Sequence, residues 1–159
     1  MITLYTDGSC PRNPGPGGWA FCVVEQGCIL HKAGGGVSEA TNNTMELQAA
    51  IEGLEYVVRQ QWHKGKLVLI SDSQYVVRGV TRWVAKWVRD DWMRTAQGRG
   101  GRQWRQEVAN KAQWQKLYQL THHTCNVEMR WERGHIGNEF NELCDKLAGE
   151  HAWQMIESL

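Results

Sequence analysis

The segment KLVLISD, residues 66–72, is a short, uninterrupted apolar run between two stretches with helical periodicity. A run of this length and composition is typical of a strand that is buried on both faces of its sheet. Residues 41–61 before it carry one apolar stripe at helical spacing, and SQYVVRGV directly after it opens another helix. A strand enclosed in this way predicts an α/β fold in which helices flank the sheet.

Four further segments complete the predicted sheet. Residues 2–7, 17–25 and 28–36 have strand character, and the short EQG connection predicts a hairpin within an antiparallel meander. Residues 125–132 provide a fifth strand, and residues 138–153 form a final helix. The large side chains expected on the inner face of this helix are Phe140, Leu143, Leu147 and Trp153. With no internal repeat and no linker, we expect one mixed sheet in a single domain.

The chain between residues 78 and 116 is strongly basic, although the net charge of the whole sequence is only +1. This segment holds ten Lys or Arg and three Asp or Glu, a net charge of +7, so the remainder carries −6. Five tryptophans alternate with the basic residues: Trp83, Trp87, Trp92, Trp104 and Trp114. Basic charge attracts phosphates and aromatic faces pack against sugars or bases, so a polyanion is the expected partner.

The same basic segment is predicted to hold a short helix, TRWVAKWV, then a polar loop, RDDWMRTAQGRGGRQ. A helix is expected again over about 103–121, with its firmest part at NKAQWQKLYQL. Trp114 stands at helical spacing from Leu117 and is expected in the core. Trp83 and Trp87 are expected to line a groove.

Composition excludes several classes of protein. The sequence contains no run of about 18 apolar residues, so we expect no membrane span. Its first residues do not resemble a secretory signal. The five cysteines are odd in number and form no C-x-x-C pair, which favours free thiols over disulfides or a zinc site. We therefore expect a cytoplasmic protein.

Two of the predicted strands end in an aspartate, Asp7 in LYTD and Asp72 in LISD. If these strands are parallel neighbours, the two carboxylates lie side by side at the edge where α/β sheets bind ligands. Their repulsion would be relieved by a hard dication. Glu46 and Asp145 flank the apolar stripes of their helices and could join them. Four acids without a Cys/His cluster favour Mg²⁺ or Mn²⁺ over zinc.

Each acid also has a plain structural interpretation. Asp7 could start a turn with Gly8, and Asp72 could cap the helix that follows it. Glu46 could close a capping box with Asn43, and Asp145 could be a solvated helix residue. His135 stands in RGHIGN between two glycines, where it could shuttle a proton or simply be an exposed loop residue.

Taken together, these segments resemble the type 1 ribonucleases H, which cut the RNA strand of RNA–DNA hybrids. The matching segments run in family order along nearly the whole chain: YTDGSCPRNPGPGGW, TNNTMEL, SDSQYV, TRWVAKWV, RGHIGN and NELCDKLA. The resemblance implies the ribonuclease H-like fold, a five-stranded mixed sheet with three antiparallel and two parallel strands flanked by helices. It also implies a basic protrusion at about residues 82–112, and the short tail and the lack of a linker lead us to expect a monomer.

The resemblance assigns roles to individual residues. Asp7, Glu46, Asp72 and Asp145 match the family's metal-binding acids, which implies two Mg²⁺ ions, with Mn²⁺ as a substitute, and products bearing a 5′-phosphate and a 3′-hydroxyl. His135 matches a loop histidine that assists proton transfer or product release. The remaining matches imply contacts to the RNA–DNA hybrid by Asn13, Asn42, Asn43 and Gln74 near the cut, by Thr41 and Asn110 at a DNA phosphate, and by Trp83 and Trp87 in the DNA groove.

The sequence departs from the family pattern in two places. QGRGGRQWRQ at 97–106 looks like an insertion that adds Arg99, Arg102 and Arg105, and it is expected to change affinity or processivity unless it is only a tolerated surface loop. Glu39 stands where some relatives have an arginine, so the DNA strand is expected to be held less tightly.

Two other functions remain open. Integrase-like and junction-resolving nucleases share clustered acids at strand ends, although they generally lack the DGS…NPGPGG turn and the tryptophan-bearing protrusion. A non-catalytic RNA–DNA hybrid-binding module is the second alternative, and it is disfavoured because every acid of the motif is present.

Overall fold

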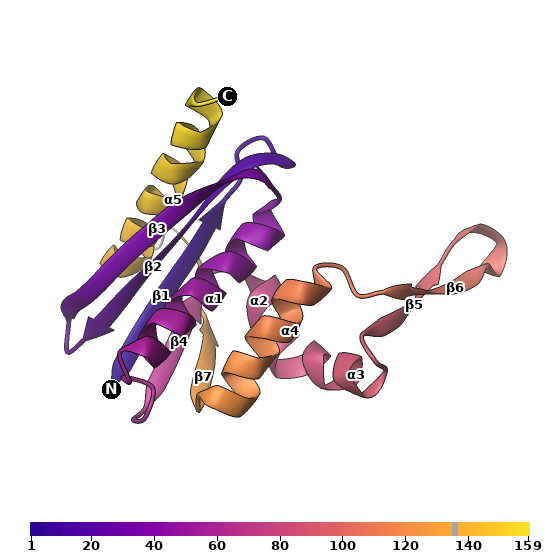
Figure 1. Cartoon of the computed structure of the whole chain (residues 1–159), viewed down its shortest axis with the longest axis horizontal. Coiled ribbons are helices and arrows are strands. Elements are labelled where there is room, and N and C mark those ends of the chain that lie inside the picture. Colours follow the sequence, from indigo (N-terminus) through magenta and orange to yellow (C-terminus); the bar gives the residue numbers. More distant parts are fainter. Residues whose placement is uncertain (135–136) are drawn as a thin grey trace.

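A five-stranded mixed sheet forms the centre of the computed structural model, which describes residues 1–134 and 137–159 (Figure 1). The strand order is β3-β2-β1-β4-β7. The first three strands pair antiparallel, whereas β1 pairs parallel with β4, and β4 parallel with β7. The bounds are β1 (Ile2–Ser9), β2 (Gly15–Glu25), β3 (Cys28–Ala40), β4 (Leu67–Ser71) and β7 (Val127–Trp131). The predicted sheet is therefore confirmed.

Helices cover both faces of this sheet (Figure 1). On one face, α1 (Asn42–Arg59) and α4 (Lys111–Gln119) bury a large apolar core that includes Leu4, Leu54 and Trp114. On the other face, α5 (Glu139–Glu157) packs on β2 through a smaller core. Strand β2 serves both layers, because Phe21 and Val23 belong to the first core whereas Ala20 and Cys22 belong to the second.

The helical segment after β4 is longer than one helix. It begins with α2 (Gln74–Arg78), continues through a π-helical turn (Gly79–Trp83) and ends with α3 (Val84–Arg89). The predicted short helix at TRWVAKWV falls within this segment. After α3 the chain leaves the body of the molecule and returns at α4 (Figure 1).

The prediction for residues 89–121 is partly wrong. Where a polar loop and then a helix were expected, the chain forms an antiparallel hairpin of β5 (Met93–Gln97) and β6 (Gln103–Glu107), and α4 begins only at Lys111. Gly100 and Gly101 have φ values of 70° and 75°, which glycine adopts without strain and which allow the chain to reverse. Pairing across this turn overrides the weak helical preference of residues 103–107.

The prediction for the last helix is wrong at Trp153, which is 50% exposed instead of facing inward. The reason is the close approach of α5 to the sheet, where Ala148 and Ala152 lie against Gly18 of β2. Trp153 follows Ala152 and so stands about 100° further round the helix, away from the sheet. Phe140, Leu143 and Leu147 are half-buried against the second core, as predicted.

All five cysteines are free thiols, and Cys28 alone among them is exposed. This agrees with the prediction of free thiols. Within the described residues, no helix is long and apolar enough to cross a membrane.

The contact between α5 and Gly18 leaves no room for a side chain, which gives a stability prediction. A Cβ at Gly18 would lie 2.2 Å from the Ala148 carbonyl oxygen and 2.6 Å from the Ala152 nitrogen. Gly18→Ala should lower the free energy of unfolding by about 1–3 kcal/mol, because backbone atoms must move. In the control Gly149→Ala, a Cβ would meet nothing within 4 Å. Urea unfolding should show this control unchanged or slightly more stable, and equal losses in both variants would contradict the proposed contact.

Candidate active site

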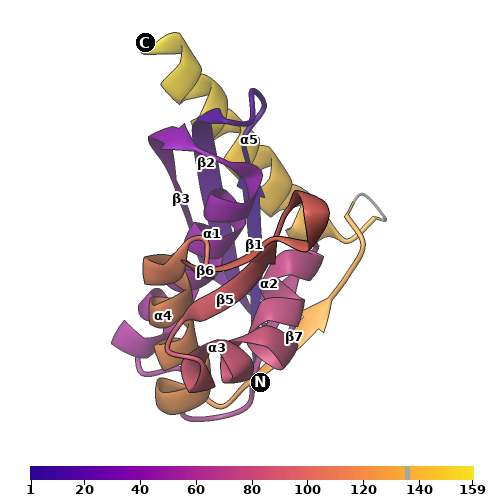
Figure 2. The ribbon, with the colours of Figure 1, turned by 90° about the vertical axis from the view of Figure 1, so that its right-hand side faces the viewer.

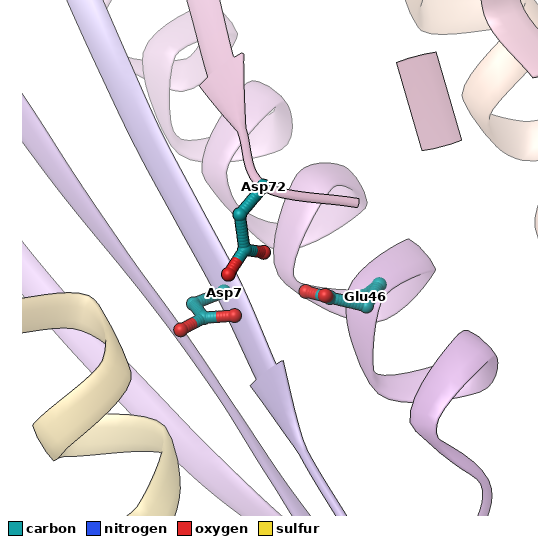
Figure 3. A group of neighbouring side chains, drawn as sticks. All are labelled: Asp7, Glu46 and Asp72. Carbon is teal, nitrogen blue, oxygen red and sulfur yellow. The ribbon is translucent and has the colours of Figure 1, made fainter. Parts of the chain in front are cut away.

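Three carboxylates meet at the carboxyl end of the two central parallel strands (Figure 3). Asp7 lies on β1, Asp72 directly follows β4, and Glu46 lies in α1. One oxygen from each side chain lies within 4.8 Å of the other two. Thr6 pairs with Ser71 in the parallel ladder, so the next residue of each strand is an aspartate at the same level. The expectation that Asp7 and Asp72 lie side by side is confirmed.

Glu46 reaches this position because α1 passes unusually close to β1. A Cβ at Gly8 would lie 2.5 Å from the Glu46 backbone nitrogen, so only glycine allows this approach. The N-cap of α1 is Thr41, whose hydroxyl accepts from the Thr44 backbone N–H at 3.1 Å, and the Thr44 hydroxyl accepts from the Thr41 N–H in return. The capping box alternative for Glu46 is therefore wrong, and its carboxylate is free to face the aspartates.

The structural alternatives for the two aspartates are also wrong. Ser73 caps α2 by accepting from the Val76 N–H at 3.2 Å, so Asp72 is not the cap. Asp7 does not start a turn, because β1 continues to Ser9 and Asp7 pairs with Ala20.

Burial makes this cluster electrostatically costly. Asp7 is only 2% exposed, and its pKa is raised to about 8, mainly by burial and then by the charges of Asp72 and Asp145. Burial, followed by the charges of Asp7 and Asp72, also raises the pKa of Glu46 well above the usual range. Within the described part of the chain, one oxygen of each acid is buried without a hydrogen-bond partner: Asp7 Oδ2, Glu46 Oε1 and Asp72 Oδ1. Such oxygens fit a hard divalent cation, which would supply both the charge and the missing contacts.

Asp145 lies close to this group without belonging to its innermost set. It is half-buried on α5, and its charge contributes to the raised pKa of Asp7. It is absent from the set of oxygens that lie within 4.8 Å of one another. The structure thus brings three of the four predicted acids into contact range and places the fourth at their side.

His135 lies outside the described residues. The chain leading to it does reach the acid cluster, because a Cβ at Gly134 would lie 2.8 Å from Asp72 Oδ2.

Further polar side chains predicted to contact the hybrid lie in the connection between β1 and β2 and at the N-termini of α1 and α2. Asn13, in the connection between β1 and β2, accepts from the Asn42 backbone N–H through Oδ1 at 3.1 Å and so joins this connection to α1. Asn43 is exposed in the first turn of α1, and Gln74 is exposed at the start of α2.

A second feature, here called the tryptophan groove, is a hollow of about 440 Å³ between the helical segment and the base of the hairpin. The lining residues are Tyr75, Arg82, Trp83, Lys86, Trp87, Arg94, Val108 and Ala109. Trp83 and Trp87 line this hollow, and their contact with DNA stays a prediction, whereas Trp114 is fully buried as predicted.

Tyr75 was not recognised from the sequence, although it connects this groove to the core. Its hydroxyl accepts from Trp114 Nε1 at 2.8 Å and from Asn110 Nδ2 at 3.2 Å. These partners are 35 and 39 residues away, so no local pattern could have indicated them. Trp131 was also missed: it is 43% exposed on β7, and its indole N–H donates to the Asp72 carbonyl at 2.9 Å.

Comparison with known proteins agrees with this geometry. The family model described as RNase H matches residues 1–153. This chain belongs to the RNase H family. A protein named Ribonuclease H from Cyanothece sp. is 43% identical over 145 residues, which cover 91% of this chain and 85% of that protein.

Solved structures of the RNase H family share the fold. LC9-RNase H1, described as a type 1 RNase H with the type 2 active-site motif, superposes with a TM-score of 0.74 at 32% identity. The match covers 97% of this chain and 72% of that one. LC11-RNase H1, solved in complex with an RNA/DNA hybrid, gives a TM-score of 0.72 at 21% identity, covering 98% and 99% of the two chains.

The buried acids predict an unusual response of stability to pH. In the metal-free protein, Asp7→Asn should raise the free energy of unfolding by about 1–3 kcal/mol at about pH 8.5. Folded Asp7 keeps its proton up to a pH of about 8, whereas an unfolded carboxyl loses it near about pH 4. The wild type therefore loses stability as the pH rises through this window, and the substitution removes that loss.

Urea unfolding in EDTA at about pH 5 and about pH 8.5 measures this effect. The gain from Asp7→Asn should be smaller at the lower pH. The control Glu25→Gln changes an exposed acid at the end of β2 and should have little effect at either pH. A gain of equal size at both pH values would show that charge is not its cause.

Proposed function

We propose that this protein hydrolyses the RNA strand of RNA–DNA hybrids as a metal-dependent endonuclease. One observation carries the proposal: three acids with buried, unpartnered oxygens meet at the end of the central strands in a chain of the RNase H family. A fold that needed these residues only for structure would be more stable without their carboxylates. Their presence is explained if they hold a cation.

Asp7, Glu46, Asp72 and Asp145 are the proposed metal ligands. All four offer only oxygen, and the described cluster includes no Cys or His, so Mg²⁺ is the proposed ion and Mn²⁺ a substitute. A bound pair of such ions would activate water and stabilise the leaving 3′ oxygen, giving 5′-phosphate and 3′-hydroxyl products. Trp131 holds the backbone of Asp72 by its hydrogen bond and so helps to orient this ligand.

His135 is proposed to assist proton transfer or product release. The proposal rests on its match to the family's loop histidine and on the closeness of Gly134 to Asp72. A histidine can carry a proton near neutral pH, which suits this role.

The RNA strand is proposed to lie along Asn13, Asn42, Asn43 and Gln74. Amide side chains both donate and accept hydrogen bonds, as a ribose 2′-hydroxyl does, and this hydroxyl distinguishes RNA from DNA. The link from Asn13 to the Asn42 backbone fixes two of these residues relative to each other.

The DNA strand is proposed to follow the tryptophan groove and a phosphate site at Thr41 and Asn110. These residues occupy the N-cap positions of α1 and α4. The two helix ends are joined by Gln113, whose Nε2 donates to the Thr44 carbonyl at 3.0 Å and to Gln48 Oε1 at 3.1 Å. The N-terminus of α4 has no side-chain cap, so its first N–H groups are available to a phosphate, and the dipoles of both helices favour an anion there. Exposed Glu39 adds a negative charge nearby in sequence, and we propose that it weakens this anchor.

The alternatives fit less well. A non-catalytic hybrid-binding module would have no use for buried carboxylates that raise one another's pKa. An integrase-like or junction-resolving nuclease would not account for the match to the RNase H family model over residues 1–153. The free thiols suit the proposed cytoplasmic location, and the monomeric state stays a prediction.

Cleavage of an end-labelled RNA–DNA hybrid tests the proposed function. Wild type should cut the RNA strand in Mg²⁺ and not in EDTA, and Asp72→Asn and Asp145→Asn should each lower kcat/KM by about 100-fold or more. Glu150→Gln is a matched control for Asp145, because it removes a charge on the exposed side of the same helix. Cleavage that persists in Asp72→Asn, or equal cutting of duplex DNA, would refute the proposal.

Removing a charge from the tryptophan groove should weaken binding without changing the chemistry. Lys86→Ala should raise KM several-fold, leave kcat nearly unchanged and reduce the slope of log K against log salt by about 1. Lys64→Ala, an exposed lysine in the connection before β4, is the control and should change neither value. An unchanged salt slope in Lys86→Ala would place the DNA strand elsewhere.

A further inference from the structure

The hairpin of β5 and β6 adds little to the core of the protein. It projects away from the sheet in Figure 1 and points toward the viewer in Figure 2. Every residue of β6 is exposed, and Ala96 is the one buried residue of β5. A two-stranded hairpin of this size is marginally stable alone, so its surface needs an explanation other than stability.

The hairpin carries positive charge that the protein itself does not neutralise. Residues 93–107 contain four arginines and one acid, Glu107, which pairs with Lys111 at 3.3 Å. In the described residues, no carboxylate lies within 4.0 Å of a guanidinium of Arg94, Arg99, Arg102 or Arg105. This charge is available to the phosphates of a ligand.

Trp104 presents a large aromatic side chain in a fixed position on this charged hairpin. It is 42% exposed, and its Nε1 donates to Gln106 Oε1 at 3.2 Å. The Arg102 guanidinium lies 5.5 Å from the centre of its ring. Across the hairpin the ring lies against Gly98, where a Cβ would come within 2.9 Å of it. The side chain is therefore held in place before any ligand binds, which lowers the entropic penalty of binding.

The face that carries Trp104 continues the tryptophan groove. Trp104 pairs with Ala96, and Arg94 with Gln106, so these residues share one face of the hairpin. Arg94 also lines the tryptophan groove. A second hollow, which shares Lys86, Trp87 and Arg94 with that groove, lies on the opposite face of the hairpin at Thr95 and Arg105 and includes Asp90. A strand leaving the groove past Arg94 would thus reach Trp104, with the Arg102 guanidinium beside its ring, on the same face of the hairpin.

We propose that the hairpin at residues 93–107 binds single-stranded DNA that continues the DNA strand of a hybrid beyond the tryptophan groove. Trp104 packs against an unpaired nucleotide, and Arg94 and Arg102 bind the adjoining phosphates. A duplex offers no free base face, because its bases are stacked on one another, whereas an unpaired nucleotide does. The strand assignment rests on the proposed function, which places the DNA strand in the groove.

The experiment compares three kinds of fluorescent ligand in binding to Asp72→Asn protein, so that cleavage does not interfere. The first is a blunt hybrid. The second is the same hybrid with a single-stranded DNA tail of about 12 nucleotides, placed at one end in one molecule and at the other end in another. The third is the same hybrid extended by duplex DNA of equal length. The single-stranded tail should tighten binding about fivefold or more at one of the two ends.

Adding Trp104→Ala should remove most of this gain and leave the blunt hybrid within about twofold, whereas Trp104→Phe should retain it. Trp153→Ala, which removes an exposed tryptophan from α5, is the matched control and should retain the gain. The proposal is overturned if the tail gives no gain, if the gain survives Trp104→Ala, or if duplex DNA gives the same Trp104-dependent gain. Cleavage of the blunt hybrid by wild type is measured separately, so failure of the proposed function is distinguishable from failure of this proposal.

Discussion

The parallel pairing of β1 with β4 is the contact on which the site depends. It sets Asp7 beside Asp72, and it requires helices on both faces of the sheet, because β4 buries Leu67 and Leu69 on one face and Val68 and Ile70 on the other. Those helices then deliver the remaining acids, Glu46 from α1 on one face and Asp145 from α5 on the other. A shift of this pairing by one residue would separate the two aspartates and turn apolar side chains out of both cores.

The acids are held together against their own repulsion. The close passage of α1 past Gly8, the cap at Thr41 and the pairing of β1 with two strands fix the backbone around them. Since the carboxylates cannot move apart, a cation or protons must offset their charge. The packed sheet and helices therefore supply the free energy that keeps the cluster assembled, a common relation between stability and active sites.

The spacing of apolar residues along the chain predicted the elements that bury an apolar face in the core. The strands, α1 and α5 were correct in type, and the alignment of Asp7 with Asp72 followed from two strands that end in the same residue. The hairpin was missed because its strands lack an apolar face and depend on pairing across a glycine turn. Trp153 was misplaced because helical spacing alone does not reveal that α5 rests on a glycine of β2. Tyr75 and Trp131 act through partners distant in sequence, which no local pattern contains.

The hydroxyl of Tyr75 joins two residues of different kinds, buried Trp114 in the core and Asn110 at the proposed phosphate site. An alteration of the core at Trp114 would free that hydroxyl to rotate and so release Asn110 from its orientation. Variants selected only for thermal stability at this position would therefore also disturb the side chain that stands at the proposed phosphate site. The packing of the core and the orientation of the proposed phosphate site thus depend on a single oxygen atom, and neither can be altered there without the other.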